Sequence, residues 1–96
     1  MAKYIGLASW TDQGVRKIKE SPARLDGVRD LAKKFGCEVT DFNMTIGAYD
    51  MVVTIEAPDD ESIAKFLLNI AAAGNVRTTT LKAFPEAEYR KVVGDM

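Results

Sequence analysis

The segment Gly47-Ala48-Tyr49-Asp50 is the one place in the chain where a turn glycine, a phenolic hydroxyl and a carboxylate occur together. Alternating apolar stretches flank it on both sides, so it is expected to join two strands. A buried carboxylate beside a hydroxyl donor could act as a general base on an enolisable small molecule. The candidate catalytic pair is therefore Asp50 as the base and Tyr49 as the hydrogen-bond donor.

Turn chemistry offers a structural interpretation of the same two residues. Aspartate in a turn commonly accepts backbone N–H hydrogen bonds, and the tyrosine ring could pack on a neighbouring chain. The structural role is favoured for Asp50, while a role in a ligand pocket stays open for Tyr49.

Three further side chains are candidates for holding a ligand. Trp10 ends the first apolar stretch and could stack on a ligand, although an aromatic residue there is more often part of a core or an interface. Arg24 and Arg77 each present a guanidinium fork that suits a carboxylate, with a solvated ion pair as the alternative. The predicted ligand-binding set is Trp10, Arg24, Tyr49, Asp50 and Arg77.

Two features of the composition limit the chemistry. The chain contains no histidine, which is the commonest metal ligand and the commonest general base near neutral pH. Its only cysteine, Cys37, excludes an intrachain disulfide and a paired-cysteine redox motif, and is expected to be a small apolar residue entering a strand. We therefore expect no metal site and no cofactor.

Length and charge place the chain among small globular domains. Its 96 residues predict a single domain over residues 1–96. The formal net charge is −1 with both signs interleaved, so nucleic acid and anionic membranes are not expected partners. The N-terminus begins a strand-like pattern at once, and no apolar run approaches the ~20 residues that a bilayer span needs. A cytoplasmic location is expected.

Two helices are predicted from their caps and apolar stripes. Thr11-Asp12 caps a short first segment, and Ser21-Pro22 supplies a second start, with serine as the cap and proline in the first turn. Apolar residues then recur at three- and four-residue intervals as far as Gly36, which closes the helix as a left-handed cap. The second helix is expected to begin at a capping Asp59 and to end at Gly74.

Four strands are predicted, over residues 3–10, 37–46, 50–57 and 76–84. The short connection between the second and third strands predicts an antiparallel hairpin. Strict alternation along the second strand places Val39 and Phe42 on opposite faces of the sheet.

The predicted order is βαββαβ followed by a short C-terminal helix that begins near Pro85. This is the ferredoxin-like α+β arrangement, in which both helices cover one face of a four-stranded antiparallel sheet. The first strand carries apolar residues on both faces, such as Tyr4 and Leu7, so the second face is also expected to be buried. We expect a homodimer or a higher homo-oligomer, with two sheets facing each other in a dimeric α/β barrel.

Five motifs spread along the chain form a recognisable set: Trp10-Thr11-Asp12-Gln13-Gly14, Ser21-Pro22 with Arg24, Gly47 with Tyr49-Asp50, Glu56-Ala57-Pro58-Asp59-Asp60 and Gly74-Asn75-Val76-Arg77-Thr78. Over essentially its whole length the chain resembles the GYD-domain family. The resemblance implies the dimeric α/β-barrel type of ferredoxin-like fold and no assigned biochemical activity. Related barrels include cofactor-independent monooxygenases, lactone isomerases and haem-degrading enzymes, which apply here only by analogy of fold.

Three functions are compatible with these residues. The first is a homo-oligomeric protein that binds a compact anionic or aromatic small molecule between its sheet and its helices. The second is a cofactor-independent isomerase or monooxygenase-like enzyme that uses Asp50 and Tyr49. The third is a purely structural subunit.

Overall fold

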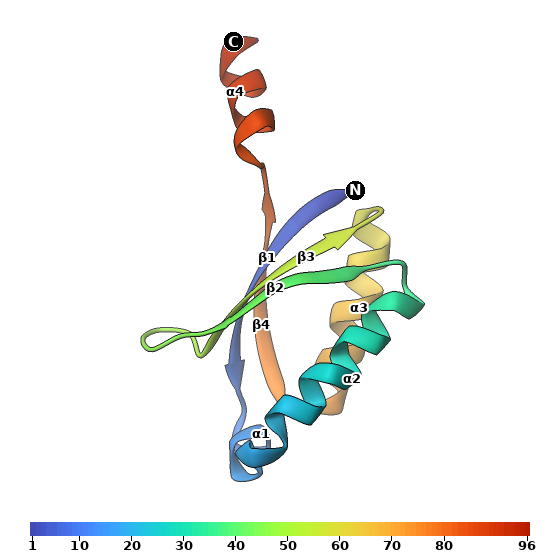
Figure 1. The fold of residues 1–96 in the computed structure, drawn as a ribbon, viewed down its shortest axis with the longest axis vertical. Coiled ribbons are helices and arrows are strands. Elements are labelled where there is room, and N and C mark those ends of the chain that lie inside the picture. The colour runs from blue at the N-terminus through green and yellow to red at the C-terminus, as the bar shows by residue number, and fades with distance from the viewer.

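The computed structural model describes residues 1–96 (Figure 1). The elements follow one another in the order β1 (Ala2–Trp10), α1 (Asp12–Arg16), a 3₁₀ turn η1 (Ile18–Glu20), α2 (Ser21–Lys34), β2 (Glu38–Met44), β3 (Met51–Ala57), α3 (Asp60–Ala73), β4 (Val76–Ala83) and α4 (Glu86–Gly94). The strands form one antiparallel sheet in the order β2-β3-β1-β4. The predicted ferredoxin-like α+β fold is confirmed.

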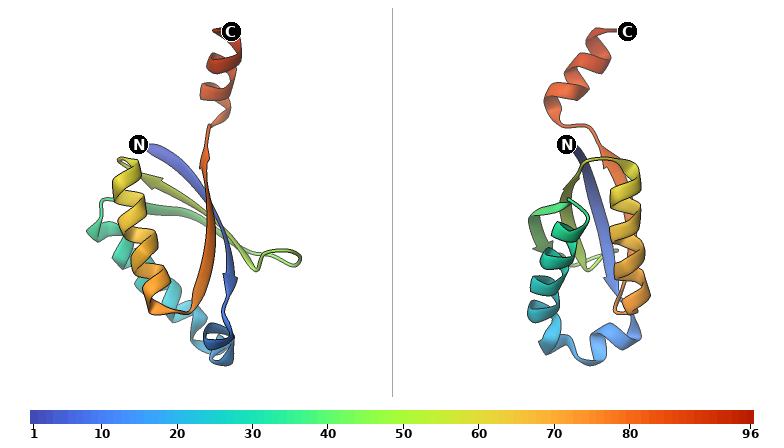
Figure 2. Two further views of the ribbon diagram at one scale, coloured as in Figure 1. Left: turned by 180° about the vertical axis from the view of Figure 1, so that it is seen from behind. Right: turned by 90° about the vertical axis from the view of Figure 1, so that its right-hand side faces the viewer.

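Helices α2 and α3 lie on the same side of the sheet (Figure 2). On β1, Tyr4 and Ala8 are buried toward these helices, and on β3 Met51 and Ile55 are buried beside them. The expected division of the apolar residues of β1 between the two faces of the sheet is therefore confirmed. We call the other side of the sheet, away from α2 and α3, the open face.

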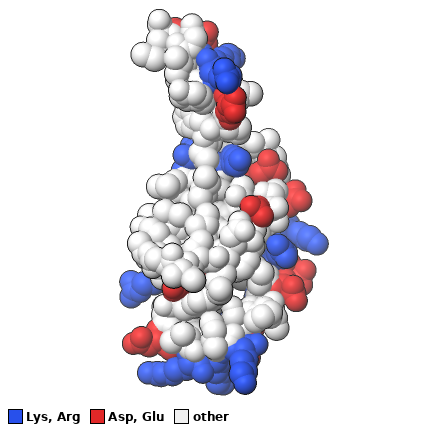
Figure 3. Space-filling model, turned by 60° about the vertical axis from the view of Figure 1, so that its left-hand side comes forward, with Lys and Arg blue, Asp and Glu red and all other residues white.

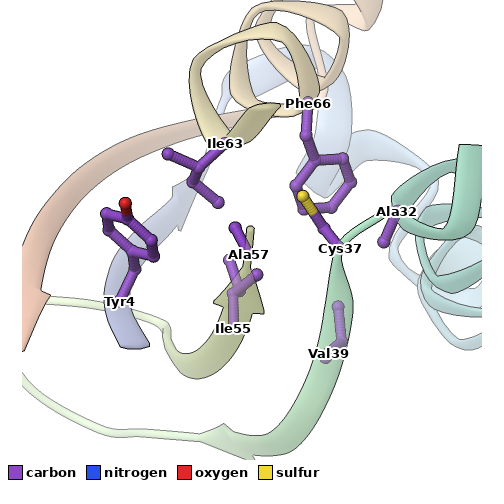
Figure 4. Packing of buried hydrophobic residues seen from close by; sticks show 8 residues of the cluster. All are labelled: Tyr4, Ala32, Cys37, Val39, Ile55, Ala57, Ile63 and Phe66. Atoms are coloured by element: carbon purple, nitrogen blue, oxygen red, sulfur yellow. The ribbon is translucent and has the colours of Figure 1, made fainter. Parts of the chain in front are cut away.

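The main hydrophobic core lies between the sheet and α3, with α2 closing one side (Figure 4). Phe66 of α3 is completely buried, and Ile63 from the same helix is nearly so. Phe66 lies beside Cys37, and Ile63 points toward Ile55. Cys37 is thus a buried apolar residue of the core, as expected from the sequence.

The helix ends agree with the sequence at all but one position. The Thr11 side chain accepts a hydrogen bond from the Gly14 N–H, and the Asp59 side chain caps α3 in the same way. Gly74 ends α3 in the left-handed conformation, with φ of 81°. The expected serine cap of α2 is wrong, because η1 runs directly into α2 and Ser21 already has helical backbone angles.

The predicted alternation of β2 is also wrong. Val39 pairs with Ile55 and Asp41 pairs with Thr54, so two steps along β2 match one step along β3. Thr40 is the extra residue of a β-bulge, which shifts the phase of the strand by one residue. Val39 and Phe42 consequently lie on the same face, toward the helices.

The C-terminal helix α4 extends beyond the body of the molecule, along its longest axis (Figure 1). Every residue from Glu86 to Met96 is exposed. None of the helices combines the length and the apolar character needed to cross a membrane.

Candidate functional site

A cavity of about 280 Å³ lies between the helix-covered face of the sheet, α2 and α3. Of the 22 residues that line it, 15 are hydrophobic, which favours a ligand with an apolar body. Residues from both helices and from β2 form much of the wall: Leu25, Val28, Leu31, Phe42, Leu67 and Ile70.

Two of the five predicted ligand-binding residues, Trp10 and Arg24, line this cavity. Arg24 comes from the first turns of α2, and its Nη2 donates a hydrogen bond to the Gly14 carbonyl oxygen at 2.9 Å. No carboxylate lies within 4.0 Å of its guanidinium, so no acidic side chain of the chain neutralises it. Trp10 and Arg24 thus bring an aromatic ring and an unneutralised cation to a mainly apolar space.

A network of hydrogen bonds holds the segment after β1 against the end of α3. The Thr11 hydroxyl donates to the Gly74 carbonyl at 2.6 Å, and the Thr11 N–H donates to the Asn75 carbonyl at 3.0 Å. The Gln13 amide donates to the Asn75 side chain at 3.1 Å. The motif that begins at Trp10 and the motif that begins at Gly74 are therefore packed directly against each other. This contact lies at one end of the cavity, because Trp10 and Asn75 both line it.

The segment around Gly14 lies so close to the backbone of Asn75 that only glycine fits at position 14. A Cβ atom at Gly14 would lie 2.0 Å from the Asn75 carbonyl oxygen, which is a backbone atom. Sequence reasoning did not identify this function of Gly14, and only its position within a five-residue motif could have pointed to it. Because Gly14 also accepts the hydrogen bond of Arg24, it links the contact with α3 to the cation at the cavity.

Tyr49 and Asp50 are not among the residues that line the cavity. The Asp50 Oδ2 accepts a hydrogen bond from the Trp10 N–H at 3.0 Å, and the Asp50 N–H donates to the Ala8 carbonyl at 2.9 Å. Tyr49 is exposed in the loop between β2 and β3, and its carbonyl accepts a hydrogen bond from the Thr45 hydroxyl at 2.6 Å. The two side chains therefore do not meet in one pocket.

Arg77 also lies away from the cavity. It pairs with Ser9 across β1 and β4, on the open face of the sheet. The structure thus brings together Trp10 and Arg24, joins Asp50 to the backbone of Trp10, and leaves Tyr49 and Arg77 elsewhere.

A second polar cluster fixes the start of α3 to the sheet. The Tyr4 hydroxyl donates a short hydrogen bond to the Asp60 carboxylate, which also lies 3.5 Å from the Lys82 Nζ. This hydrogen bond and burial raise the pKa of Tyr4 to about 12, while the same hydrogen bond, assisted by Lys82, lowers the pKa of Asp60. Burial raises the pKa of the Cys37 thiol, which disfavours a reactive thiolate.

The titratable side chains do not form a metal centre. No group of three or more Cys, Asp or Glu side chains is placed so that it could hold an ion.

Comparison with solved structures supports the fold. The feast or famine regulatory protein of M. tuberculosis, solved with L-methionine, is 18% identical with a TM-score of 0.68, and this chain covers 51% of it. The leucine response regulatory protein of Mycobacterium tuberculosis is also 18% identical, with a TM-score of 0.66 and 51% of its chain covered. Each comparison covers 88% of this chain, which spans about half the length of either regulator.

A smaller structure matches over nearly its whole length. A hypothetical protein from Pyrococcus horikoshii is 18% identical with a TM-score of 0.59, over 88% of this chain and 92% of that one. At this level of identity, the three structures show a shared fold.

Comparison of sequences identifies the family. A protein of Thermus thermophilus named glutamine synthetase and cystathionine beta-lyase binding protein is 35% identical over 89 residues, which are 92% of this chain and 94% of that protein. The GYD domain model matches residues 4–93. The chain belongs to the GYD domain family.

Proposed function

We propose that this protein is a homo-oligomeric binding protein whose cavity between sheet and helices holds a compact small molecule. The observation that carries the proposal is the mainly apolar cavity of about 280 Å³ with Arg24 in its wall. Pockets of this kind bind the apolar body of a ligand, and a few polar groups fix its orientation. The ligand that fits best is an organic anion with an aliphatic or aromatic body, its charged group toward Arg24.

The lack of a carboxylate near Arg24 supports this choice of ligand. A guanidinium beside apolar surface interacts strongly with a carboxylate, because the local dielectric constant is lower than in water. The hydrogen bond to Gly14 uses one of the guanidinium donors and leaves others for a ligand. Trp10 adds a flat apolar surface to the same cavity.

A second candidate function is binding to a metabolic enzyme. It is favoured by the Thermus thermophilus relative, which is named as a binding protein for two enzymes and matches over 92% of this chain. The two functions are compatible, because a ligand in the cavity contacts α2 and α3 and could change the positions of these helices, and with them the surface that binds an enzyme. Under this proposal the protein acts as a regulatory binding subunit in the cytoplasm.

The enzymatic alternative has weaker support. An isomerase or monooxygenase-like mechanism needs Asp50 as a free base near bound substrate, yet Asp50 accepts the Trp10 N–H and lies outside the cavity wall. Tyr49 has no place beside the cavity from which it could donate a hydrogen bond to the same substrate. A purely structural subunit would leave the cavity without a ligand.

The homo-oligomer is proposed from two exposed apolar surfaces. Leu81 on the open face is 49% exposed, and Tyr89 on α4 is 58% exposed. Exposed apolar side chains that gather on one surface often mark an interface with another chain.

Native mass spectrometry of protein purified from its own host tests the ligand. We expect a retained small molecule in the wild type and its loss in Arg24→Gln, which removes the cation. Arg77→Gln is the matched control, because it removes the same charge from the open face and should keep the ligand. A wild type without any bound molecule, or equal retention in the two variants, would contradict the proposal.

A further inference from the structure

The cavity between the sheet and the helices has a polar end and an apolar end. The polar side chains of its wall belong to the first turn of α2, the last turns of α3 and the first half of the segment that follows α3. They are Ser21, Arg24, Asn69, Asn75 and Thr78. The wall at the opposite end is apolar, and three of its residues, Val39, Ile55 and Phe66, belong to the hydrophobic core (Figure 4). A ligand with one polar head and one apolar tail matches this division.

The polar end of the cavity is also the cationic end of the molecule. Arg24 lies in the cavity wall, and the neighbouring α1 and η1 segment carries Arg16, Lys17 and Lys19. None of these side chains has a carboxylate within 4.0 Å. Figure 3 shows Lys and Arg gathered at the lower end of the molecule, where Figure 1 places α1. The positive potential at this end favours an anionic head group over a cationic one.

The cavity is long in the direction of the strands. On the sheet side, its wall runs along β1 from Trp10 past Ala8 to Gly6, which is about 13 Å in an extended strand. On the helix side, the wall runs along α2 from Ser21 to Leu31, which is about 15 Å along a helix axis. A volume of about 280 Å³ spread over this length is narrow, so it suits an unbranched chain better than a broad ring system.

Gly6 keeps the far part of this cavity open. It is buried in the middle of β1, between Val53 of β3 and Thr80 of β4. A Cβ atom at Gly6 would meet no atom closer than the Val53 carbonyl oxygen at 3.8 Å, and its φ is not in the left-handed region. Neither packing nor backbone conformation therefore requires glycine here. Glycine weakens the interior of a strand and often marks a site where a ligand approaches closely.

We propose that the cavity binds an unbranched medium-chain carboxylate such as decanoate, and that Gly6 determines the length of the chain that it accepts. The carboxylate lies at the α1 end, where Arg24 binds it, and the hydrocarbon chain passes Trp10 and Ala8 and ends over Gly6. Extended decanoate is about as long as the cavity wall from Trp10 to Gly6. This inference rests on the proposed small-molecule binding function and adds the class of ligand and the residue that selects it.

Titration of the full chain with decanoate and with hexanoate tests the role of Gly6. The fluorescence of Trp10 reports binding directly, because Trp10 is the only tryptophan of the chain and lines the cavity. Gly6→Val places a side chain where the end of the longer ligand would lie. It is expected to raise the dissociation constant of decanoate at least tenfold and that of hexanoate no more than twofold. Valine is favoured in strands, so the sheet should form as in the wild type.

Ser9→Val is the matched control, because it introduces valine into the same strand on the open face of the sheet. It is expected to leave both dissociation constants within about twofold of the wild type. Decylamine has the same chain length as decanoate with a cationic head, and it is expected to bind the wild type at least tenfold more weakly. If Gly6→Val were to disturb folding, the smaller change Gly6→Ala is expected to weaken decanoate binding in the same direction.

Brominated decanoates test the direction in which the ligand lies. Bromine quenches indole fluorescence at short range, and Trp10 is at the end of the cavity where the carboxylate is expected. At saturation, 2-bromodecanoate should therefore quench Trp10 more strongly than 10-bromodecanoate. Stronger quenching by 10-bromodecanoate would overturn the proposed direction.

The possible failures can be told apart. Decanoate binding that Arg24→Gln weakens but Gly6→Val leaves unchanged would overturn the role of Gly6 and support the proposed function. An equal loss of hexanoate and decanoate in Gly6→Val would overturn the selection by chain length. A wild type that binds neither carboxylate would overturn the ligand class, while the molecule retained in native mass spectrometry, and its loss in Arg24→Gln, would still support the proposed function.

Discussion

Asp50 joins β1 to β3 at the end where the hairpin leaves the sheet. Its carboxylate accepts the Trp10 N–H, a bond that a backbone carbonyl would otherwise supply. Asp50→Ala removes the acceptor and leaves this N–H without a partner, which costs about 1–3 kcal/mol. For a domain of this size the melting temperature should fall by roughly 4–20 °C.

Asp50→Asn should lower the melting temperature by less than Asp50→Ala does. The neutral amide oxygen of asparagine can still accept the hydrogen bond from the Trp10 N–H, at about half the strength of the bond to a carboxylate. Asp41→Asn is the control, since Asp41 is exposed and its carboxylate meets only the Asn43 side chain, at 3.2 Å. Thermal melts of the three variants give the comparison. A change at Asp41 as large as that at Asp50 would contradict the assigned role.

Tyr4 gives the stability of the protein a dependence on alkaline pH. Its pKa is raised from 10.0 to about 12, chiefly by the hydrogen bond to Asp60. A group whose pKa is higher in the folded state stabilises the fold fully below its unfolded pKa and loses this effect as the pH rises through the folded value. The melting temperature should therefore fall between about pH 10 and about pH 12.

Tyr4→Phe should reduce this alkaline decrease, because phenylalanine has no proton to lose. It also removes the hydrogen bond that chiefly lowers the pKa of Asp60, so acid-induced unfolding should change as well. Tyr89→Phe, in the exposed helix α4, should leave both limbs of the pH profile as they are in the wild type. Melting curves from pH 3 to pH 12 that coincide for Tyr4→Phe and the wild type would show that the cluster contributes nothing.

The contact between α1 and the end of α3 depends on one glycine, Gly14. Gly14→Ala would place a Cβ atom 2.0 Å from the backbone oxygen of Asn75, so the two segments must move apart. Overpacking of this kind costs about 1–3 kcal/mol. The displacement should also move Arg24, whose guanidinium is bound to the Gly14 carbonyl.

Gly27→Ala is the matched substitution in α2, where an added Cβ meets nothing within 4 Å. Alanine is favoured over glycine inside a helix by about 0.5–1 kcal/mol. The two variants are therefore expected to change the melting temperature in opposite directions, down for Gly14→Ala and up for Gly27→Ala. Equal effects would mean that the close approach to Asn75 does not determine the outcome.

At the level of the whole molecule, the exposed apolar side chains on the open face and on α4, such as Leu81 and Tyr89, predict that stability depends on protein concentration. If copies of the chain associate, the folded oligomer is favoured at higher concentration, and the melting temperature rises with it. Thermal melts between about 1 and 100 μM should show this rise in the wild type. A melting temperature that stays constant over this range would indicate a monomer.

The sequence by itself determined the order of the elements, most of their caps and the two faces of β1. These features depend on local chemistry, because each is determined by residues that are close together in the sequence. Examples are the spacing of apolar residues, the capping aspartate at Asp59 and the left-handed glycine at Gly74. The same local signals misplaced Val39, because the extra residue of a bulge is visible only from the pairing of β2 with β3. They also misassigned Ser21 as a cap, since the preceding 3₁₀ turn continues directly into α2.

Only the tertiary structure decided which candidate residues lie together. Trp10 and Arg24 are distant in sequence from the α3 residues of the cavity, and the packing of helices on the sheet brings them there. Tyr49 is adjacent to Asp50 in the chain, yet Asp50 turns to the backbone of Trp10 while Tyr49 stays exposed in the loop. Adjacency in sequence does not fix side-chain direction at a turn, because long-range pairing of β1 with β3 sets where each residue of the hairpin points.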